Sequence, residues 1–153
     1  MSPEEVLERE GLTLQVAHPV VANYVPTVRT GSLVFVSGHG PFVEGKPAHM
    51  GKLGFDLTVE DGRKAAETVL LNILGTLKGE LGELSRISRF VKLLVLVNAA
   101  LDFSQHHLVA DGATDLLVKV FGETGRPARS AVGLASLPFN FSVEIEAVVE
   151  VRD

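Results

Sequence analysis

The spacing of apolar residues along the chain predicts two long helices. Over residues 58–81, apolar side chains recur three and four positions apart, the pattern of a helix laid on a sheet. Thr58 followed by Asp61 resembles a capping box, so we expect this helix to begin there. A second helix is expected over residues 104–122, with Gly112 as a candidate break and Gly122 as the stop.

Smaller elements are predicted on either side of these helices. Residues 3–10 have the pattern of a short helix with Ser2 as its N-cap, and "LTLQV", residues 12–16, has the alternation of a first strand. In the first long helix, Gly75 and Gly79 lie four positions apart and therefore share a face. They permit close approach of another backbone.

Four further segments have the character of strands. Residues 88–100 are apolar at almost every position, like a central strand covered on both sides. The others are residues 32–38, 129–137 and 141–151. The order strands, helix, strand, helix, strands predicts an α/β fold, with one mixed β-sheet and two long helices packed on one face. No linker or repeat interrupts residues 1–153, so we expect a single domain.

The last strand alternates strictly, which divides its side chains between two faces. Val143 and its odd-numbered neighbours suit the helices, while Glu144, Glu146 and Glu150 point the other way. If Val132 pairs with Ile145 in a hairpin, Arg129 lies on the glutamate face, roughly 13 Å from Glu144.

On the same register, small residues line the sheet face that the helices leave open. These residues are Ala131, Gly133 and Ala135. A face of this kind often meets another subunit, so a cyclic oligomer is expected.

Composition and charge exclude several classes of protein. The net charge is −5 and Lys and Arg are scattered, so nucleic-acid binding is not expected. Cysteine is absent, which excludes disulfides and thiolate chemistry. The N-terminus has no apolar signal segment, and no apolar run is long enough to cross a bilayer. A cytoplasmic protein without membrane attachment is the expectation.

Motifs for phosphate, metal and serine chemistry fail on inspection. Gly40 to Lys46 fits G-x-x-x-x-G-K, but Pro47 replaces the required Ser or Thr, and a Gly/Pro-rich hairpin is favoured. No histidine pair has zinc-protease spacing, so neither a metal nor another cofactor is expected. Ser37 lacks the glycine of a nucleophile elbow, although it ends a strand where a side chain can face a pocket.

Arg129 is the strongest candidate for binding a ligand. It follows the stiff Pro127–Ala128 pair and enters a strand of small residues, and its guanidinium can bind a carboxylate through two hydrogen bonds. The alternative is an edge-strand arginine exposed to water. Likewise, Glu144 and the other glutamates of its strand either contribute to a site or form a solvated face.

The order of four segments resembles the RidA (YjgF) family of enamine/imine deaminases. The segments are "LVFVSGHGP", "FVKLLVLVNAALDF", "GRPARSAV" and "LPFNFSVEIEAVVEV". The resemblance implies a chorismate-mutase-like fold and a homotrimer with a site between neighbouring subunits. It also implies hydrolysis of 2-imino acids, derived from enamines, to 2-oxo acids and ammonia.

Four residues match functional positions of that family. By resemblance, Arg129 binds the substrate carboxylate and Glu144 holds or activates the attacking water, while Tyr24 and Ser37 line the pocket. Two positions depart from the family and mark a divergent branch: Ala131 replaces a common cysteine, and His39 replaces a glutamine. The alternative is a non-catalytic trimer that binds small carboxylates in the same cleft. RNA cleavage, a label also attached to this family, is disfavoured by the charge.

Overall fold

The computed structural model describes residues 1–16 and 19–153. Its helices are α1 (Pro3–Arg9), α2 (Val59–Leu81) and α3 (His106–Phe121). Its strands are β1 (Thr27–Thr30), β2 (Leu33–His39), β3 (Phe42–Val43), β4 (Lys46–Pro47), β5 (Ile87–Asn98), β6 (Ala128–Leu134) and β7 (Val143–Val151). Short 3₁₀ turns occupy residues 84–86, 122–125 and 138–140.

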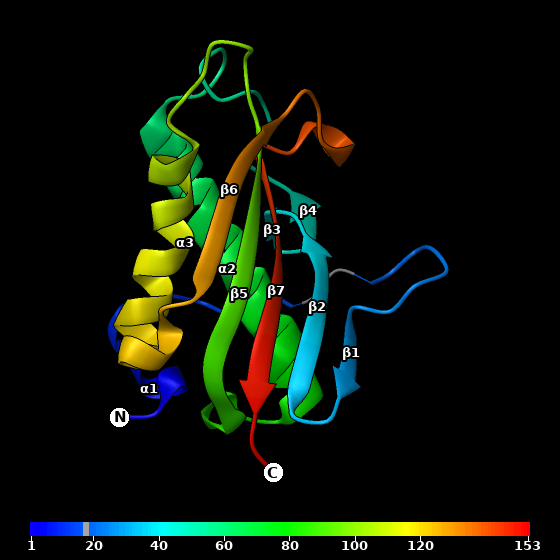
Figure 1. Ribbon diagram of the computed structural model, residues 1–153, viewed down its shortest axis with the longest axis vertical. Coiled ribbons are helices and arrows are strands. Elements are labelled where there is room, and N and C mark those ends of the chain that lie inside the picture. The colour runs from blue at the N-terminus through cyan, green and yellow to red at the C-terminus, as the bar shows by residue number, and fades with distance from the viewer. Residues whose placement is uncertain (17–18) are drawn as a thin grey trace.

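Five strands form one mixed sheet in the order β1-β2-β7-β5-β6, and α2 and α3 lie side by side on one face of it (Figure 1). Only β6 is parallel to its neighbour β5; the other pairs are antiparallel. The α/β architecture with two long helices on one face is therefore confirmed. β3 and β4 form the separate hairpin that the Gly/Pro-rich segment predicted.

Both predicted N-caps are present. The Ser2 hydroxyl accepts a hydrogen bond from the amide of Glu5, and Thr58 does the same for Asp61, each within a reciprocal capping box. Such a cap contributes about 1 kcal/mol to helix stability. The apolar stripe of α2 is fully buried against the sheet and α3, which forms the main core.

Two helix glycines allow backbone crossings. A Cβ at Gly75 would overlap the carbonyl oxygen of Gln15, and one at Gly112 would overlap that of Arg63 on α2. The predicted close approach at Gly75 is thus confirmed. The candidate break at Gly112 is wrong: α3 continues unbroken, because this glycine serves contact with α2.

Residues 12–16 are not the predicted strand. Leu12 and Leu14 pack against the core, while Val16 is exposed. These residues form an extended segment that crosses α2 at Gly75. The alternation of apolar residues therefore comes from packing on a helix and not from pairing in the sheet.

The predicted pairing of the last two strands is also wrong. β5 lies between β6 and β7, and Arg129 pairs with Leu93 of β5, whose side chain is buried under the helices. Paired residues share a face, so Arg129, Ala131 and Gly133 lie on the helix face. The physical cause is the connection between the strands, which crosses the end of β5 instead of forming a hairpin.

Consequently the open face of the sheet is more apolar than predicted. Val132 and Leu134 lie there on β6, and both are exposed. Val28 and Phe35 are exposed on the same face at the other side of the sheet. No helix in the described part of the chain is long and apolar enough to cross a membrane.

Candidate active site

A pocket of about 190 Å³ lies where β2 ends and β7 begins. A cavity of this size suits a small molecule. Four of the predicted site residues line it: Tyr24, Ser37, His39 and Glu144. The remaining two, Arg129 and Ala131, do not.

Two glycines at the end of β2 give neighbouring side chains access to the pocket. A Cβ at Gly38 would lie 3.0 Å from Oε2 of Glu144. A Cβ at Gly40 would collide with the ring of Phe141. The glycines of the "SGHG" segment therefore make room for the side chains of Glu144 and Phe141, a role that the sequence alone did not indicate.

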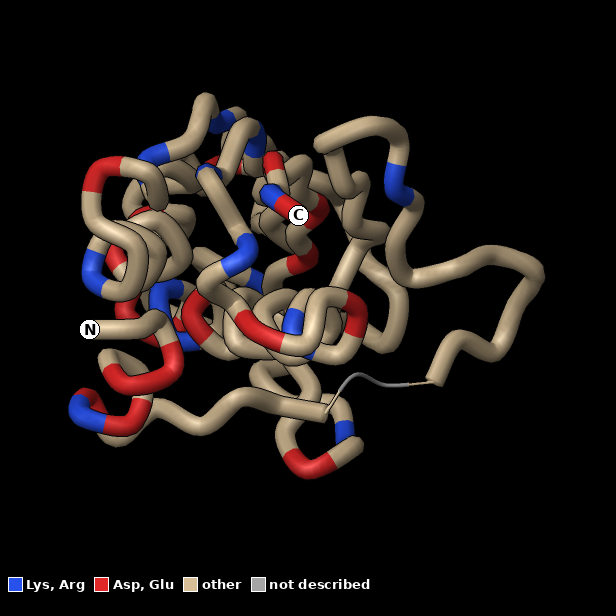
Figure 2. Tube along the Cα trace, turned by 90° about the horizontal axis from the view of Figure 1, so that it is seen from below, with Lys and Arg blue, Asp and Glu red and all other residues tan. Residues whose placement is uncertain are grey.

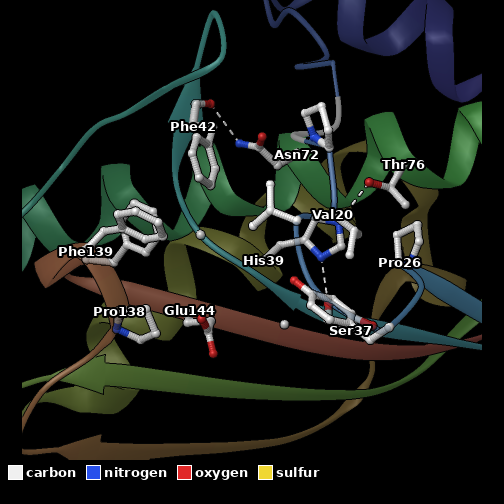
Figure 3. Close-up of a pocket in the computed structure, with 16 residues that line it drawn as sticks. Val20, Pro26, Ser37, His39, Phe42, Asn72, Thr76, Pro138, Phe139 and Glu144 are labelled. Atoms are coloured by element: carbon white, nitrogen blue, oxygen red, sulfur yellow. Dashed lines mark hydrogen bonds between the residues drawn. The ribbon is translucent and has the colours of Figure 1, made fainter.

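His39 is held on both ring nitrogens. Nδ1 lies 2.6 Å from the carbonyl oxygen of Ser37, and Nε2 lies 2.8 Å from Oγ1 of Thr76 on α2 (Figure 3). A carbonyl only accepts, so Nδ1 carries the proton and Nε2 accepts from the Thr76 hydroxyl. Burial lowers the pKa of His39, which the hydrogen bond to Ser37 partly opposes. His39 is thus a neutral, fixed wall of the pocket.

The Glu144 carboxyl group makes no hydrogen bond or ion pair with the described residues, and unlike Glu146 and Glu150 it lines the pocket. It is half-buried, and burial, followed by the charge of Glu146, raises its pKa. Within one chain Arg129 does not offset this rise, since it lies on the other face of the sheet. An unpartnered carboxyl group with a raised pKa in a pocket is suited to proton transfer.

α2 contributes two polar residues that we did not predict. The Asn72 amide donates to the carbonyl of Phe42 at 2.9 Å, and Thr76 holds His39 (Figure 3). Both are buried, at 1% and 6% exposure. The sequence does contain a sign of both residues, because Asn72 and Thr76 are polar residues among the buried apolar residues of α2.

An aromatic wall closes one side of the pocket. It consists of Phe42, Phe139 and Phe141, with ring centroids 5.2 Å apart for Phe42–Phe141 and 5.3 Å for Phe139–Phe141. Pro138 continues it (Figure 3). Phe42 comes from strand β3 of the hairpin, and the other two rings come from the turn before β7. No local sequence pattern indicates that these two segments meet.

Arg129 is bound by α3. Its Nη1 donates to Oδ1 of Asp111 at 2.8 Å and to Oγ1 of Thr114 at 3.1 Å. Its Nη2 donates to the carbonyl oxygen of His107 at 3.4 Å, and the side chain remains 23% exposed. Ala131 packs partly against the core on the same face.

Metal binding finds no support among residues 1–16 and 19–153, where no group of three or more histidine or acidic side chains could hold an ion. His49 instead contacts the Thr68 hydroxyl at 3.2 Å. His18, one of the five histidines considered for a metal, lies outside the described residues.

Comparison with known proteins identifies the family to which this chain belongs. Residues 4–150 match the family model described as "YjgF/chorismate mutase-like, putative endoribonuclease". The chain belongs to the YjgF/RidA family. The chorismate-mutase-like fold inferred from the sequence is thereby confirmed.

Individual relatives cover nearly the whole chain. Protein TCP17 of Trypanosoma cruzi is 42% identical over 148 residues, which are 96% of this chain and 92% of that protein. The crystal structure of Atu1372 from Agrobacterium tumefaciens, described as a protein with unknown function, has a TM-score of 0.93 and 47% identity, covering 98% of this chain and 92% of its own.

RidA itself is a more distant relative. RidA from the Antarctic bacterium Psychrobacter sp. PAMC 21119 has a TM-score of 0.60 and 27% identity, covering 91% of this chain and 98% of its own. The shared fold is clear at this level. The TM-score with RidA is lower than the TM-score with Atu1372, which agrees with a divergent branch of the family.

Proposed function

We propose that this protein hydrolyses small 2-imino acids, and the enamines in equilibrium with them, to 2-oxo acids and ammonia. The observation that carries the proposal is the unpartnered Glu144 carboxyl group in a pocket already lined by Tyr24, Ser37 and His39. Such a group can accept a proton from water, and its negative charge attracts the cationic carbon–nitrogen double bond of a protonated imine.

The reaction needs one base and one water molecule. Glu144 takes a proton from water as the water oxygen bonds to the imine carbon, which gives a tetrahedral carbinolamine. The protonated Glu144 returns this proton to the nitrogen, and the carbon–nitrogen bond breaks as the hydroxyl proton goes back to Glu144. The products are a 2-oxo acid and ammonia, and ammonia takes the remaining proton from Glu144 to leave as ammonium, which restores the base. The oxidation state of the substrate carbons is unchanged.

The substrate carboxylate requires a cation that one chain does not supply. No Lys or Arg is among the described residues lining the pocket. We therefore propose that Arg129 of a neighbouring copy completes the site in a homotrimer, as the family resemblance implies. Two features support this: β6 is an edge strand of the sheet, and the Arg129 side chain stays 23% exposed although Asp111, Thr114 and His107 bind its two Nη atoms.

The open face of the sheet supports assembly. Four large apolar residues are exposed there by 39–54%: Val28, Phe35, Val132 and Leu134. An apolar patch on a regular sheet favours contact with another copy. We propose that this face is covered in the trimer.

RNA cleavage, which the family description names, has less support. Lys and Arg are interspersed with Asp and Glu along the described chain (Figure 2), and the net charge is −5. Phosphate contacts require a concentration of positive charge. Glu144, Glu146 and Glu150 on the open face would repel a phosphate backbone.

The proposal is tested by imine decay in a coupled assay. An amino-acid oxidase generates the imine, and semicarbazide competes with the protein for it. Wild type should reduce semicarbazone formation, and Glu144→Gln should lower the rate constant about 100-fold or more, as for loss of a general base. Glu150→Gln is the matched control, since it removes a carboxyl group on the same strand and face outside the pocket. Carboxylate binding by an inert wild type would favour the non-catalytic alternative instead.

A further inference from the structure

The turn that carries Phe139 has an unusual backbone. Phe139 and Asn140 are consecutive non-glycine residues in the left-handed region, with φ of 57° and 56°. A bulky residue such as Phe139 adopts this conformation only where the surrounding structure enforces it. Strain of this kind is concentrated at sites that bind or react.

The surrounding contacts enforce this conformation from two sides. Buried Asn98 donates to Oδ1 of Asn140 at 3.1 Å, and the amide of Gly51 donates to the Asn140 carbonyl at 2.8 Å. Lys52 holds Oδ1 of Asn98 at 2.7 Å and also donates to the carbonyl of Ala135. The turn is therefore a fixed support and not a flexible loop.

The result of this support is an exposed aromatic ring at the pocket. Phe139 is 65% exposed although its backbone is strained and tied down. Its ring stacks at a tilt on the buried Phe141, and both line the pocket together with Pro138 (Figure 3). A structure that holds an apolar ring open to solvent at such cost has positioned it for a ligand.

The rest of the lining defines which ligand group fits there. Besides the aromatic wall, the pocket is lined by Pro19, Val20, Val21 and Pro26, and its ionisable side chains are Tyr24, His39 and Glu144. His39 is neutral, because burial lowers its pKa. Ser37, Asn72 and Thr76 also line the pocket, but their side chains hydrogen-bond within the protein. Glu144 is then the group positioned for the reacting atoms, and the proline, valine and phenylalanine lining matches an apolar side chain.

We infer that the pocket selects 2-imino acids with branched or aromatic side chains over three-carbon substrates, and that Phe139 is the specificity-determining residue. This inference rests on the proposed hydrolysis for the reacting end of the substrate. The preference for the substrate side chain is inferred from the aromatic wall and does not depend on the reaction.

The kinetic test compares imines made from leucine, phenylalanine and alanine. Wild type should prefer the first two in kcat/KM by about 10–200-fold, the range that apolar pockets achieve. Phe139→Ala should lower this preference about tenfold, because the leucine- and phenylalanine-derived imines lose more in kcat/KM than the alanine-derived imine does. Phe55→Ala is the matched control, because Phe55 is 80% exposed and lies outside the pocket. An unchanged preference in Phe139→Ala would overturn the assignment.

A binding test separates this inference from the proposed function. Calorimetry measures phenylpyruvate, 4-methyl-2-oxopentanoate and pyruvate, which resemble the products, on wild type and Phe139→Ala. Preferential binding of the two larger acids that is lost in Phe139→Ala, without imine turnover, supports the pocket assignment and rejects the hydrolysis. Turnover with no preference among side chains rejects the pocket assignment and keeps the hydrolysis. The pocket assignment is also rejected if none of the three acids binds and the three imines are either hydrolysed at equal rates or not hydrolysed at all.

Discussion

Arg129 and Glu144 lie on opposite faces of the sheet, with β5 between their strands. Arg129 pairs with Leu93 on the helix face, whereas Glu144 pairs with Leu96 on the open face. One chain therefore cannot place both side chains in the same pocket. The two residues act together only if a neighbouring copy supplies one of them.

The pH dependence should follow Glu144. The base form is required, and burial and the charge of Glu146 raise its pKa, so kcat/KM should fall as the pH drops through this raised value. Glu146→Gln removes the like charge and should move the acid limb of the profile to lower pH. A profile of kcat/KM between pH 4 and 8 measures both. An acid limb that is the same in the two proteins would contradict this role for Glu146.

The same shift affects stability. A carboxyl group with a raised folded pKa binds protons more tightly in the folded state, so its contribution is favourable below the unfolded pKa and is lost as pH rises through the folded pKa. Glu144→Gln, which carries no charge, should therefore gain Tm relative to wild type at pH 7 and lose that advantage near pH 4. Thermal unfolding of both proteins across this range checks the sign. An advantage that grows toward low pH would contradict it.

Gly75 and Gly79 provide a matched pair for the backbone crossing on α2. Gly75→Ala gains about 1 kcal/mol of helix propensity but collides with the Gln15 carbonyl, and overpacking of this kind costs about 1–3 kcal/mol. Gly79→Ala meets nothing within 4 Å and should stabilise by about 1 kcal/mol. Urea unfolding should rank the proteins Gly79→Ala, wild type, Gly75→Ala. Equal gains from both alanines would show that residues 12–16 do not pack on Gly75.

Arg129 should stabilise the fold of each chain as well as serve the site. Its pair with Asp111 is partly buried, at 23% and 35% exposure, and charge-assisted hydrogen bonds contribute about 1.5–3 kcal/mol. Arg129→Ala should therefore lower the free energy of unfolding by about 1–2 kcal/mol. Arg126→Ala is the control, because its pair with Glu123 is exposed and such pairs contribute about 0–1 kcal/mol. If both variants lose equally little, α3 does not hold Arg129.

The helices were predictable because their signals are local. Thr58 with Asp61, and Ser2 with Glu5, define each start within one turn. The alternation along β7 likewise identified which of its side chains face the core. The strand that pairs with β6 was not predictable from the sequence. Every second residue of β6 is small, and the connection from β6 to β7 crosses β5, so no local pattern shows which strand is its neighbour.

The pocket was predictable in part. Tyr24, Ser37, His39 and Glu144 were expected there from the resemblance, and the fold brings all four to one cavity. The aromatic wall was not expected, since the turn that carries Phe139 is held at Asn140 by Asn98 and Gly51, which are far away in sequence.

A complementation experiment tests the shared site most directly. Arg129→Ala and Glu144→Gln should each be inactive alone. After the two proteins are unfolded, mixed in equal amounts and refolded together, about a quarter of the interfaces in a random cyclic assembly combine an intact Glu144 with an intact Arg129. The account predicts recovery of about 25% of wild-type imine hydrolysis in the mixture. Mixed assemblies, verified by mass spectrometry, that remain as inactive as either variant would contradict a site built from two chains.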